Sequence, residues 1–404
     1  MSHDVIVVGA GPAGAATGIL LAERGARVLV LDRARFQRPK ICGEYLSPEA
    51  ARLLDRLGAL KAVDDAGAVA LRGMAITAPD GTRLVGTYPT ALPWRGFRDH
   101  ALALPRFVLD RVLTDRLRET AADFRERWRV TDLIVVGDRV VGVEGVDADG
   151  RVSPFRAPIV VGADGRNSVV ARRLGLVSPH PLRRLACISY ASRAGELNAS
   201  GEIFVDPPVY SIVNPVAPGR VNLSLVMPLD WARRHRGQIE RFFDESIGRL
   251  RHLTERFPDL RREAPVLALG PLAYRVAPPR HGGLLLVGDA AGFYDPLTGE
   301  GVYAALAGAE LAAAAALRAL GSEGAATLGA GSYERARRRA FSGKQRVTRA
   351  LQFAIARRSR ANAVAHMFAR RPALLDLVLG VIGDFVPPRA LLGSRALGAL
   401  LRWG

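Results

Sequence analysis

Length, composition and charge place the chain among globular proteins that bury a large core. It has 404 residues, of which 49% are hydrophobic and 24% charged. The net charge of +18 comes almost entirely from arginine, since lysine occurs only three times. The two cysteines, Cys42 and Cys187, exclude a disulfide framework and indicate a reducing compartment. Neither a nucleic-acid reading motif nor a cluster of metal-ligand residues is apparent, so we expect no nucleic acid partner and no metal.

The first 32 residues carry a dinucleotide-binding pattern. A buried strand that begins at Asp4 runs into Gly9, Gly11 and Gly14, then a helix, then a strand that ends at Asp32. The first glycine permits a tight turn, the second a close backbone approach, and the third close helix–strand packing. A pyrophosphate would lie at the helix N-terminus, where the unpaired N–H groups and the dipole favour negative charge. Because this strand begins so early, we expect no signal peptide and a cytoplasmic protein.

The rest of the chain alternates between strand and helix signals. Helices are expected over 49–57, from about 104 to 125 and over 231–257, the last as one element. Strand signals lie at 69–88 (a hairpin), 128–135, 139–146, 151–161, 185–228 and 282–289. The last of these strands leads through a glycine-rich loop into an alanine-rich stretch, which indicates a buried helix rather than a membrane span.

These signals predict an α/β fold with three parts. A discontinuous Rossmann-like dinucleotide-binding domain, with a parallel sheet and the GxGxxG βαβ unit, is expected at 1–70, 100–180 and 270–330. An inserted antiparallel β-sheet domain for the substrate is expected at 71–99 and 181–269. A C-terminal helical segment is expected at 331–404.

Two further motifs follow the glycine turn in order. Gly162-Ala-Asp164-Gly165 ends one strand pattern, and Gly288-Asp289 ends another and leads to Gly301. With the turn, they resemble the flavoproteins of the para-hydroxybenzoate hydroxylase fold, and within them the geranylgeranyl reductase-like branch. The resemblance implies an FAD-binding domain, with NAD(P)H as a transient electron donor. It implies an FAD site formed by Gly9, Gly11, Pro12, Ala13, Gly14, Asp32, Arg33, Gly43, Arg106, Val130, Asp164, Gly288, Asp289, Pro296, Gly299, Glu300 and Gly301.

A loop after the second strand provides two catalytic candidates. Residues 40–44, Lys-Ile-Cys-Gly-Glu, resemble the Lys-x-Cys-Gly segment that approaches the flavin in the geranylgeranyl reductases. We therefore name Cys42 and Glu44 as catalytic candidates. The structural alternatives are a small buried apolar role for Cys42 and a helix cap for Glu44.

The β-rich region departs from the family. Residues 207–215, Pro-Pro-Val-Tyr-Ser-Ile-Val-Asn-Pro, resemble a Pro-x-x-Tyr-x-Trp-x-Phe-Pro segment that lines the reductases' lipid tunnel, without its Trp and Phe. Strand alternation places Tyr210, Ile212 and Asn214 on one face, so we name them as substrate-binding and Tyr210 also as catalytic. The alternative is that these three residues have only a structural role in the sheet. The exchange of two aromatic rings for an apolar chain and an amide favours a substrate with polar or phenolic groups.

Three functions are therefore considered. The favoured one is an NAD(P)H-dependent monooxygenase that hydroxylates an aromatic, phenolic or lipid-tailed small molecule through a flavin C4a-hydroperoxide. The alternative is a geranylgeranyl-type ene-reductase of isoprenoid double bonds, and a remote one is a prenyl-binding escort protein without redox chemistry. The weaker resemblance to halogenases lacks their Trp-x-Trp-x-Ile-Pro segment.

The C-terminal region combines arginines with apolar residues at helical spacing. Between Tyr333 and the C-terminus, 15 basic residues face 3 acidic ones, and apolar runs include 346–371 and 390–403. This pattern fits a peripheral contact with the inner face of a membrane. Helices that cap the flavin domain, with their arginines in water, are an equal alternative.

Overall fold

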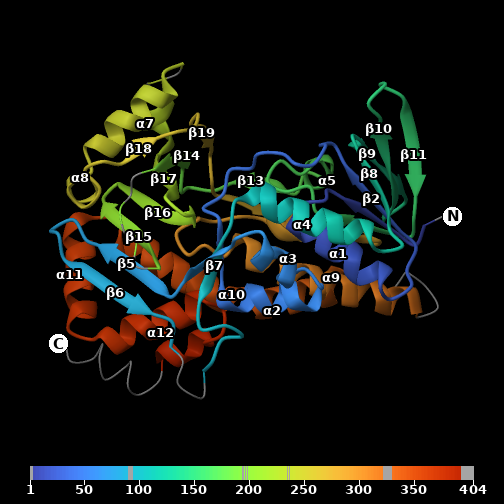
Figure 1. Cartoon of the computed structure of the whole chain (residues 1–404). Helices are drawn as coiled ribbons and strands as arrows, with labels where there is room; N and C mark the ends of the chain where they lie inside the picture. The colour runs from blue at the N-terminus through green and yellow to red at the C-terminus, as the bar shows by residue number, and fades with distance from the viewer. Residues whose placement is uncertain are drawn as a thin grey trace.

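A five-stranded parallel sheet forms the centre of one half of the molecule (Figure 1). The computed structural model describes residues 3–392 except 90–93, 193–194, 196, 198, 234, 236 and 322–329. The sheet has the order β21-β12-β1-β2-β8 and consists of β1 (Val5–Val8), β2 (Val28–Asp32), β8 (Asp123–Glu126), β12 (Ile159–Gly162) and β21 (Leu284–Leu286). Strands β1, β2, β12 and β21 are apolar and buried along almost their whole length, as expected for parallel strands covered on both faces.

The two faces of this sheet are covered by different elements. Alternate residues Val5 and Val7 pack with α1 (Pro12–Ala22), α4 (Arg106–Arg118) and α9 (Gly301–Gly321). The intervening Ile6 and Val8 pack with α5 (Val169–Arg173) and with an antiparallel sheet of β9 (Arg129–Val136), β10 (Arg139–Val146) and β11 (Val152–Arg156). The carboxyl ends of β1, β12 and β21 therefore open at one edge, where the predicted glycine motifs follow them.

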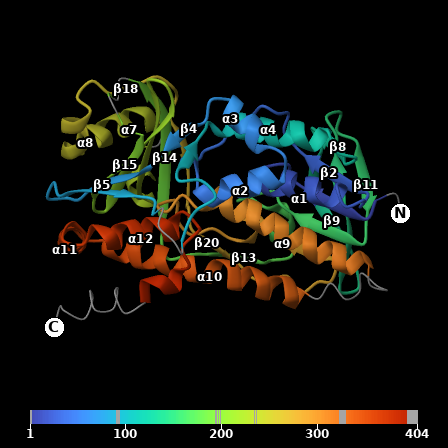
Figure 2. The same cartoon turned by 60° about the horizontal axis from the view of Figure 1, so that its bottom comes forward.

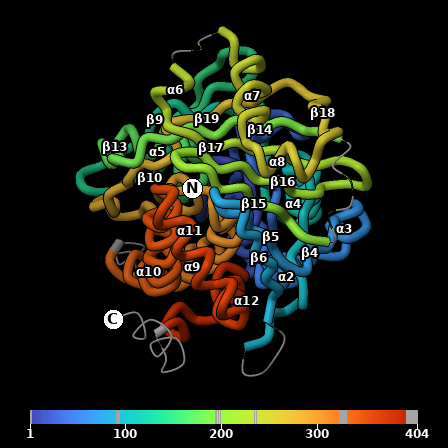
Figure 3. Tube along the Cα trace, turned by 90° about the vertical axis from the view of Figure 1, so that its left-hand side faces the viewer, coloured from blue at the N-terminus to red at the C-terminus, as the bar shows by residue number. Residues whose placement is uncertain are grey.

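The other half is built on an eight-stranded, largely antiparallel sheet in the order β18-β14-β17-β16-β15-β5-β6, with β19 paired to β14. Its strands are β5 (Gly73–Thr77), β6 (Arg83–Thr87), β14 (Arg184–Ser192), β15 (Ser200–Asp206), β16 (Val209–Ala217), β17 (Arg220–Pro228), β18 (Arg261–Arg262) and β19 (Leu267–Leu269). One face packs with α6 (Leu229–Arg233), α7 (Ile239–Gly248) and α8 (Arg251–Arg256). Figure 3 shows the sheet between these helices and the C-terminal helices.

Short elements join the two halves. They are the small sheet of β3 (Tyr45–Leu46), β4 (Val69–Leu71) and β7 (Ala101–Ala103), the pair β13 (Val177–Pro179) and β20 (Tyr274–Val276), the helices α2 (Pro48–Arg56) and α3 (Leu60–Asp65), and the 3-10 turn η1 (Gly288–Ala291). Strand β3 directly follows the loop that contains Cys42, so this loop lies between the two large sheets.

The C-terminal region continues with α10 (Ala330–Ala354), α11 (Arg358–Ala369), α12 (Pro372–Ile382) and the short η3 (Pro388–Leu392). Helix α10 runs beside α9 (Figure 2), and apolar residues of α11 and α12 such as Phe368 and Leu375 pack with β5 and β6. The described apolar residues of this region thus cover the eight-stranded sheet, while the expected segment 390–403 lies outside the described residues beyond Leu392.

Among the described helices, α9 is long and apolar enough to cross a membrane. In the fold its alanine face packs against α1, and residues such as Ala309 and Ala312 are fully buried. The expectation of a buried helix at this position is confirmed.

Three expected elements differ from the structure. The strand predicted over 151–161 is two strands, β11 and β12, in different sheets; Pro158 lies between them and has no N–H for a ladder. The single helix predicted over 231–257 is the three short helices α6, α7 and α8, interrupted at Gly237 with a φ of +80° and at Leu250. The helix predicted to end near 125 ends at Arg118, and the parallel strand β8 follows it.

Candidate functional site

The glycine turn after β1 has the backbone that the sequence pattern requires. Gly9 has a φ of +96°, and a Cβ there would lie 2.6 Å from the Ala163 carbonyl oxygen. A Cβ at Gly14 would lie 1.7 Å from the Gly9 carbonyl oxygen. Both positions therefore exclude any side chain, and they direct the N-terminus of α1 at the open edge of the sheet.

The second and third motifs meet this turn. Pro12 and Ala13 are the first residues of α1, and a Cβ at Gly288 would lie 3.0 Å from the Ala13 methyl group. Asp32, at the end of β2, accepts hydrogen bonds from the Ala10 amide at 2.7 Å and from the Ala34 amide at 2.8 Å. The carboxylate thus fixes both the glycine turn and its own loop.

At four motif glycines from separate segments, an added side chain would extend into open space. A Cβ at Gly43 would meet no atom within 4 Å, and at Gly11, Gly165 and Gly301 the nearest atoms would be 4.0, 3.9 and 4.0 Å away. Elsewhere in the same motifs, at Gly9 and Gly14, a Cβ would clash with backbone. The residues present therefore fit an extended planar cofactor such as FAD, which needs backbone on several sides at close approach.

We call the open space at Gly11, Gly43, Gly165 and Gly301 the cradle. The carboxylates of the two later motifs add polar groups to it. One Asp164 oxygen accepts the Val169 amide at 2.7 Å and caps α5, whereas its other oxygen is buried without a partner. Burial raises the pKa of Asp289, and the nearby Lys40 and Arg106 oppose this rise. The unpartnered Asp164 oxygen and the Asp289 carboxylate are the groups that would accept hydrogen bonds from hydroxyl groups of a bound cofactor.

Sequence reasoning missed two residues beside the glycine turn. Arg38 lies with one terminal nitrogen 4.0 Å from an Asp32 oxygen and the other 4.0 Å from an Asp110 oxygen. Asp110 is fully buried and accepts a 2.8 Å hydrogen bond from Arg106, one turn earlier on α4. The i,i+4 spacing of Arg106 and Asp110 was the available signal for this pair. Arg106 is only 9% exposed, so it is a buried charge paired with Asp110 and not a solvated surface arginine.

Two of the residues predicted to bind the cofactor have side chains that do not face the cofactor site. Arg33 is exposed, within the turn that the Asp32 side chain stabilises through the Ala34 amide. Val130 is buried in the cluster under the parallel sheet, with Leu29 and Leu31. A contact from either residue to a cofactor would therefore come from its backbone.

The segment from Pro296 to Gly301 leads into α9, as predicted. Gly299 has a φ of +63°, and a Cβ there would lie 2.5 Å from the Tyr45 ring. Glu300 faces α10, where it accepts a hydrogen bond from Thr348 at 3.3 Å. This glutamate therefore connects the loop to α10, and the helix N-terminus at Gly301 remains open toward the cradle.

Glu44 is a buried carboxyl with three hydrogen-bond donors. It has a φ of +58° and is 3% exposed. Its Oε1 atom accepts the Tyr190 hydroxyl at 2.7 Å and the Arg106 amide at 2.8 Å, and its Oε2 atom accepts the Asn222 side-chain amide at 3.1 Å. Burial raises the pKa of Glu44, and the hydrogen bonds oppose this rise. The carboxyl does not cap the next helix, α2, which Ser47 caps; through the Arg106 amide it instead caps the first residue of α4.

Side chains from the eight-stranded sheet bind the backbone of the Cys42–Glu44 loop. Asn222 also donates to the Cys42 carbonyl oxygen at 2.9 Å, and Asn214 donates to the Gly43 carbonyl oxygen at 3.1 Å. Tyr190, Asn222 and Asn214 are direct cross-strand neighbours on β14, β17 and β16. Only the strand register brings them together, so no local sequence signal could have identified Tyr190 or Asn222.

Cys42 lies beside Glu44 and is partly exposed. Its sulfur accepts the Glu44 amide at 3.3 Å, and burial raises the pKa of the thiol. The thiol is therefore protonated at neutral pH and is a weak nucleophile.

The three residues predicted to line the substrate site do share one face of β16. The Tyr210 hydroxyl and the Asn214 side-chain nitrogen donate within the protein, whereas the Asn214 Oδ1 atom is buried without a hydrogen-bond partner. The Tyr210 hydroxyl donates to Asp295 at 2.7 Å, and Gln352 of α10 donates to the same carboxylate oxygen at 2.6 Å. Ile212 packs with Leu297 in the cluster between the sheet and α10. Asp295 and Gln352 were not predicted from the sequence.

The comparisons with known sequences agree with the site. The chain matches the FAD binding domain family over residues 2–349. It is 32% identical over 340 residues to the menaquinone reductase of Mycolicibacterium smegmatis, with 77% of this chain and 75% of that protein covered. It is 29% identical over 325 residues to the digeranylgeranylglycerophospholipid reductase of Methanosarcina mazei, with 79% and 76% covered. It is 30% identical over 344 residues to conditioned medium factor receptor 1 of Dictyostelium discoideum; that match covers 78% of this chain and 64% of that protein.

Solved structures show the same fold at lower identity. A flavoprotein/dehydrogenase from Cytophaga hutchinsonii superposes with a TM-score of 0.84 at 20% identity, over 99% of this chain and 98% of that one. The myxobacterial chondrochloren halogenase superposes with a TM-score of 0.81 at 23% identity, over 93% and 92%. From the family match and the sequence relatives, the chain belongs to the FAD-dependent oxidoreductases of the FAD binding domain family, in the geranylgeranyl reductase-like branch of the para-hydroxybenzoate hydroxylase fold.

Proposed function

We propose that this FAD-dependent oxidoreductase reduces a carbon–carbon double bond in an isoprenoid chain, with Glu44 as the proton donor. The observation that carries the proposal is the buried Glu44 carboxyl, held by Tyr190 and Asn222 next to Gly43. Saturation of a double bond adds a hydride to one carbon and a proton to the other. When bound and reduced, FAD would supply the hydride, and the proton would come from a protein side chain or from water.

Glu44 meets the requirements of that proton donor. Burial raises the pKa of its carboxyl, so it retains a proton at higher pH than an exposed glutamate. The Tyr190 hydroxyl and the Asn222 amide stabilise the carboxylate that remains after the proton has left. The adjacent Gly43 leaves its Cβ side open, so Glu44 lies next in sequence to a position where the backbone has room for the cofactor. Solvent then returns the proton to Glu44.

The residues of β16 favour the reductase over the monooxygenase predicted from the sequence. The argument for a phenolic substrate rested on the Tyr210 hydroxyl and the Asn214 amide as polar groups of the substrate site. In the fold, these groups donate to Asp295 and to the Cys42–Glu44 loop. These two donors are engaged within the protein, which weakens the case for a polar substrate; the Asn214 Oδ1 atom is the one polar atom of this pair that is buried without a partner.

The relatives supply the substrate class. Two of the proteins to which the chain is similar are named menaquinone reductase and digeranylgeranylglycerophospholipid reductase. Both names contain an isoprenoid compound, which supports a hydrophobic isoprenoid substrate here. NAD(P)H as the reductant of FAD, and access to the substrate at the cytoplasmic face of a membrane, belong to the same proposal.

The test is an anaerobic single turnover. FAD bound to the protein is reduced with dithionite and mixed with a geranylgeranyl lipid, and flavin reoxidation is followed by absorbance. We expect reoxidation together with a product heavier by one H₂ for each double bond reduced. Reoxidation that requires oxygen, with a product heavier by one oxygen atom, would support the monooxygenase instead.

The Glu44→Gln variant separates the proton donor from the cofactor site. Its amide has nearly the same shape but no transferable proton, so we expect FAD binding to persist while turnover falls about a hundredfold or more. The matched control is Glu202→Gln, which changes a buried carboxyl that pairs with Arg83 and Arg256 in the same sheet. An equal loss in both variants would point to a general effect on the sheet.

A further inference from the structure

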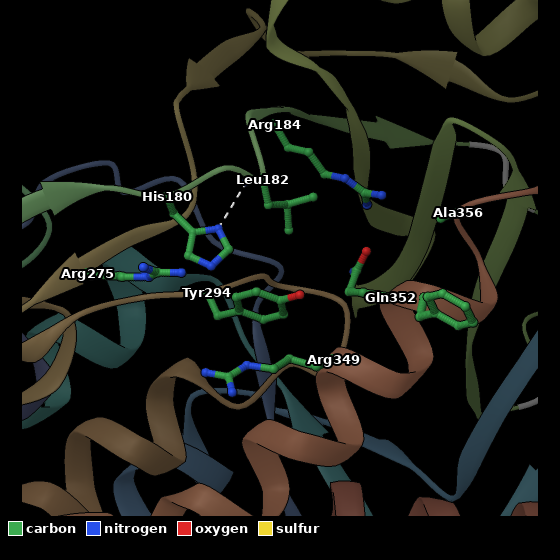
Figure 4. Close-up of a pocket in the computed structure, with 9 residues that line it drawn as sticks. His180, Leu182, Arg184, Arg275, Tyr294, Arg349, Gln352 and Ala356 are labelled. Atoms are coloured by element: carbon green, nitrogen blue, oxygen red, sulfur yellow. Dashed lines mark hydrogen bonds between the residues drawn. The ribbon is translucent and has the colours of Figure 1, made fainter.

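A second cavity lies outside the cradle described above, between the two halves of the molecule and α10. It has a volume of about 630 Å³, within the range of small-molecule sites. Its walls come from the β13–β14 connection, β20, the loop after η1 and α10. The lining residues are His180, Leu182, Arg184, Arg275, Tyr294, Arg349, Gln352, Phe353 and Ala356 (Figure 4).

The cavity is strongly cationic. Arg184, Arg275 and Arg349 line it, and none of its lining residues is acidic. Among the described residues, no carboxylate lies within ion-pair distance of Arg275 or Arg349. Three arginines from three separate elements line one cavity, and two of them have no acidic partner, which indicates a site for an anion, since each guanidinium presents planar donors that suit phosphate.

Buried polar atoms in the wall lack partners. Arg184 is 7% exposed and Gln352 4% exposed, yet the Nη1 atom of Arg184 and the Oε1 atom of Gln352 have no hydrogen-bond partner. Such groups are costly to bury unless a ligand or water satisfies them. The Asp295 carboxylate behind this wall lies 3.9 Å from Arg184 and offsets one of the three positive charges, which leaves the cavity with a net positive charge.

His180 and Tyr294 add neutral donors. The Nδ1 atom of His180 accepts the Leu182 amide at 3.0 Å, which assigns the ring proton to Nε2. Burial and the charges of Arg275 and Arg349 lower the pKa of His180, so it is neutral at pH 7. Its ring packs edge-on against Tyr294 with 5.4 Å between centroids, and Arg349 lies 5.7 Å from the centre of the same tyrosine ring.

One side of the cavity is apolar. Phe353 is 67% exposed, and Leu182 and Ala356 also line the cavity. A large aromatic side chain exposed at the edge of a cationic cavity indicates a ligand with both an anionic group and an apolar part.

We propose that this cavity binds a phosphate-bearing ligand, with its phosphate on Arg184, Arg275 and Arg349 and its apolar part against Phe353. The phosphate belongs either to the headgroup of an amphipathic lipid or to a dinucleotide such as NADPH. None of the lining residues is part of the Glu44 site, and the binding does not depend on the reaction proposed there.

The test measures binding to the FAD-loaded protein by calorimetry, without turnover. The probes are octyl phosphate, octanol as the uncharged analogue, and NADPH. Arg349→Gln and Arg275→Gln are expected to weaken binding of the phosphate probe about tenfold each, because each removes a charge-assisted hydrogen bond. Arg346→Gln, an exposed arginine three residues before Arg349 on α10, is the matched control and is expected to bind as the unmodified protein does.

The outcomes separate the ligand sources. Arginine-dependent binding of octyl phosphate supports the proposal with a lipid phosphate, and arginine-dependent binding of NADPH supports it with a nucleotide phosphate. Equal binding of octanol and octyl phosphate, or equal affinities in Arg349→Gln and Arg346→Gln, would overturn it. The FAD absorbance of every variant reports that the cofactor site is intact. Because no turnover is measured, failure here leaves the double-bond reduction untouched.

Discussion

The Tyr190→Phe variant removes one hydrogen bond from the proposed proton donor and leaves the ring in place. In the protein the Tyr190 hydroxyl donates to Glu44 at 2.7 Å, and this bond is the largest of the effects that lower the pKa of the Glu44 carboxyl. A hydrogen bond to a charged group contributes about 1.5–3 kcal/mol. At about 1.4 kcal/mol per unit, its loss raises the pKa of Glu44 by about one to two units.

The direction of the resulting shift follows from the role of Glu44. A proton donor acts in its protonated form, so turnover falls as pH rises through the pKa of Glu44. In Tyr190→Phe this alkaline limb is expected about one to two units higher. Burial already raises the pKa of Glu44 in the folded protein, so its stabilising contribution is present at low pH and is lost as pH rises through the folded pKa. In Tyr190→Phe, the stabilising contribution of Glu44 is therefore lost at higher pH than in the unmodified protein.

Two measurements check this prediction. The pH profile of anaerobic flavin reoxidation measures the pH at which turnover falls on the alkaline side. The infrared band of the protonated carboxyl measures the protonation of Glu44 directly, without turnover. Tyr333→Phe is the control, because the Tyr333 hydroxyl donates at the same 2.7 Å to the Leu286 carbonyl and is remote from Glu44 in the hydrogen-bond network. An unmoved limb in Tyr190→Phe, or a limb moved to lower pH, would refute the reasoning.

Two more predictions concern the cradle and the C-terminal region. The Gly43→Ala variant is expected to fold normally but to bind FAD more weakly, because its added methyl group would take up space that the cofactor needs. Fluorescence titration of FAD measures this affinity. The control is Gly248→Ala, where a Cβ also meets no atom within 4 Å, and this variant should bind FAD as the unmodified protein does. Burial raises the pKa of Asp384 from 3.8 to about 6, against the opposing charge of Lys344 at 2.5 Å. This contribution is present below pH 4 and is lost as pH rises to about 6, so Asp384→Asn should lose that part of the pH dependence in urea unfolding, and an unchanged pH dependence would contradict the assignment.

The predictions that succeeded from sequence rest on short-range patterns. The turn at Gly9 and Gly14 and the strand end at Asp32 are set by residues within one βαβ unit, where backbone sterics decide the conformation. The parallel strands β1, β2 and β21 were recognised from continuous apolar runs. The single helix expected over 231–257 was wrong, because helical periodicity outweighed the turn at Gly237.

The parts that were missed depend on long-range pairing. Tyr190 and Asn222 reach Glu44 only through the register of β14 with β17, and Asp295 reaches Gln352 only because α10 returns to the sheet. The assignment of Tyr210 and Asn214 to the substrate site used the correct strand alternation. It did not reveal that both side chains would find partners within the protein.

The most direct test of the proposed reaction is a single anaerobic turnover in D₂O with an isoprenoid substrate. In D₂O both the flavin hydrogen that is transferred and the Glu44 proton exchange with solvent, so we expect deuterium at both carbons of each reduced double bond, and we expect Glu44→Gln to slow product formation about a hundredfold. A product formed only with O₂ and carrying an oxygen atom from it, or full activity in Glu44→Gln, would contradict the account.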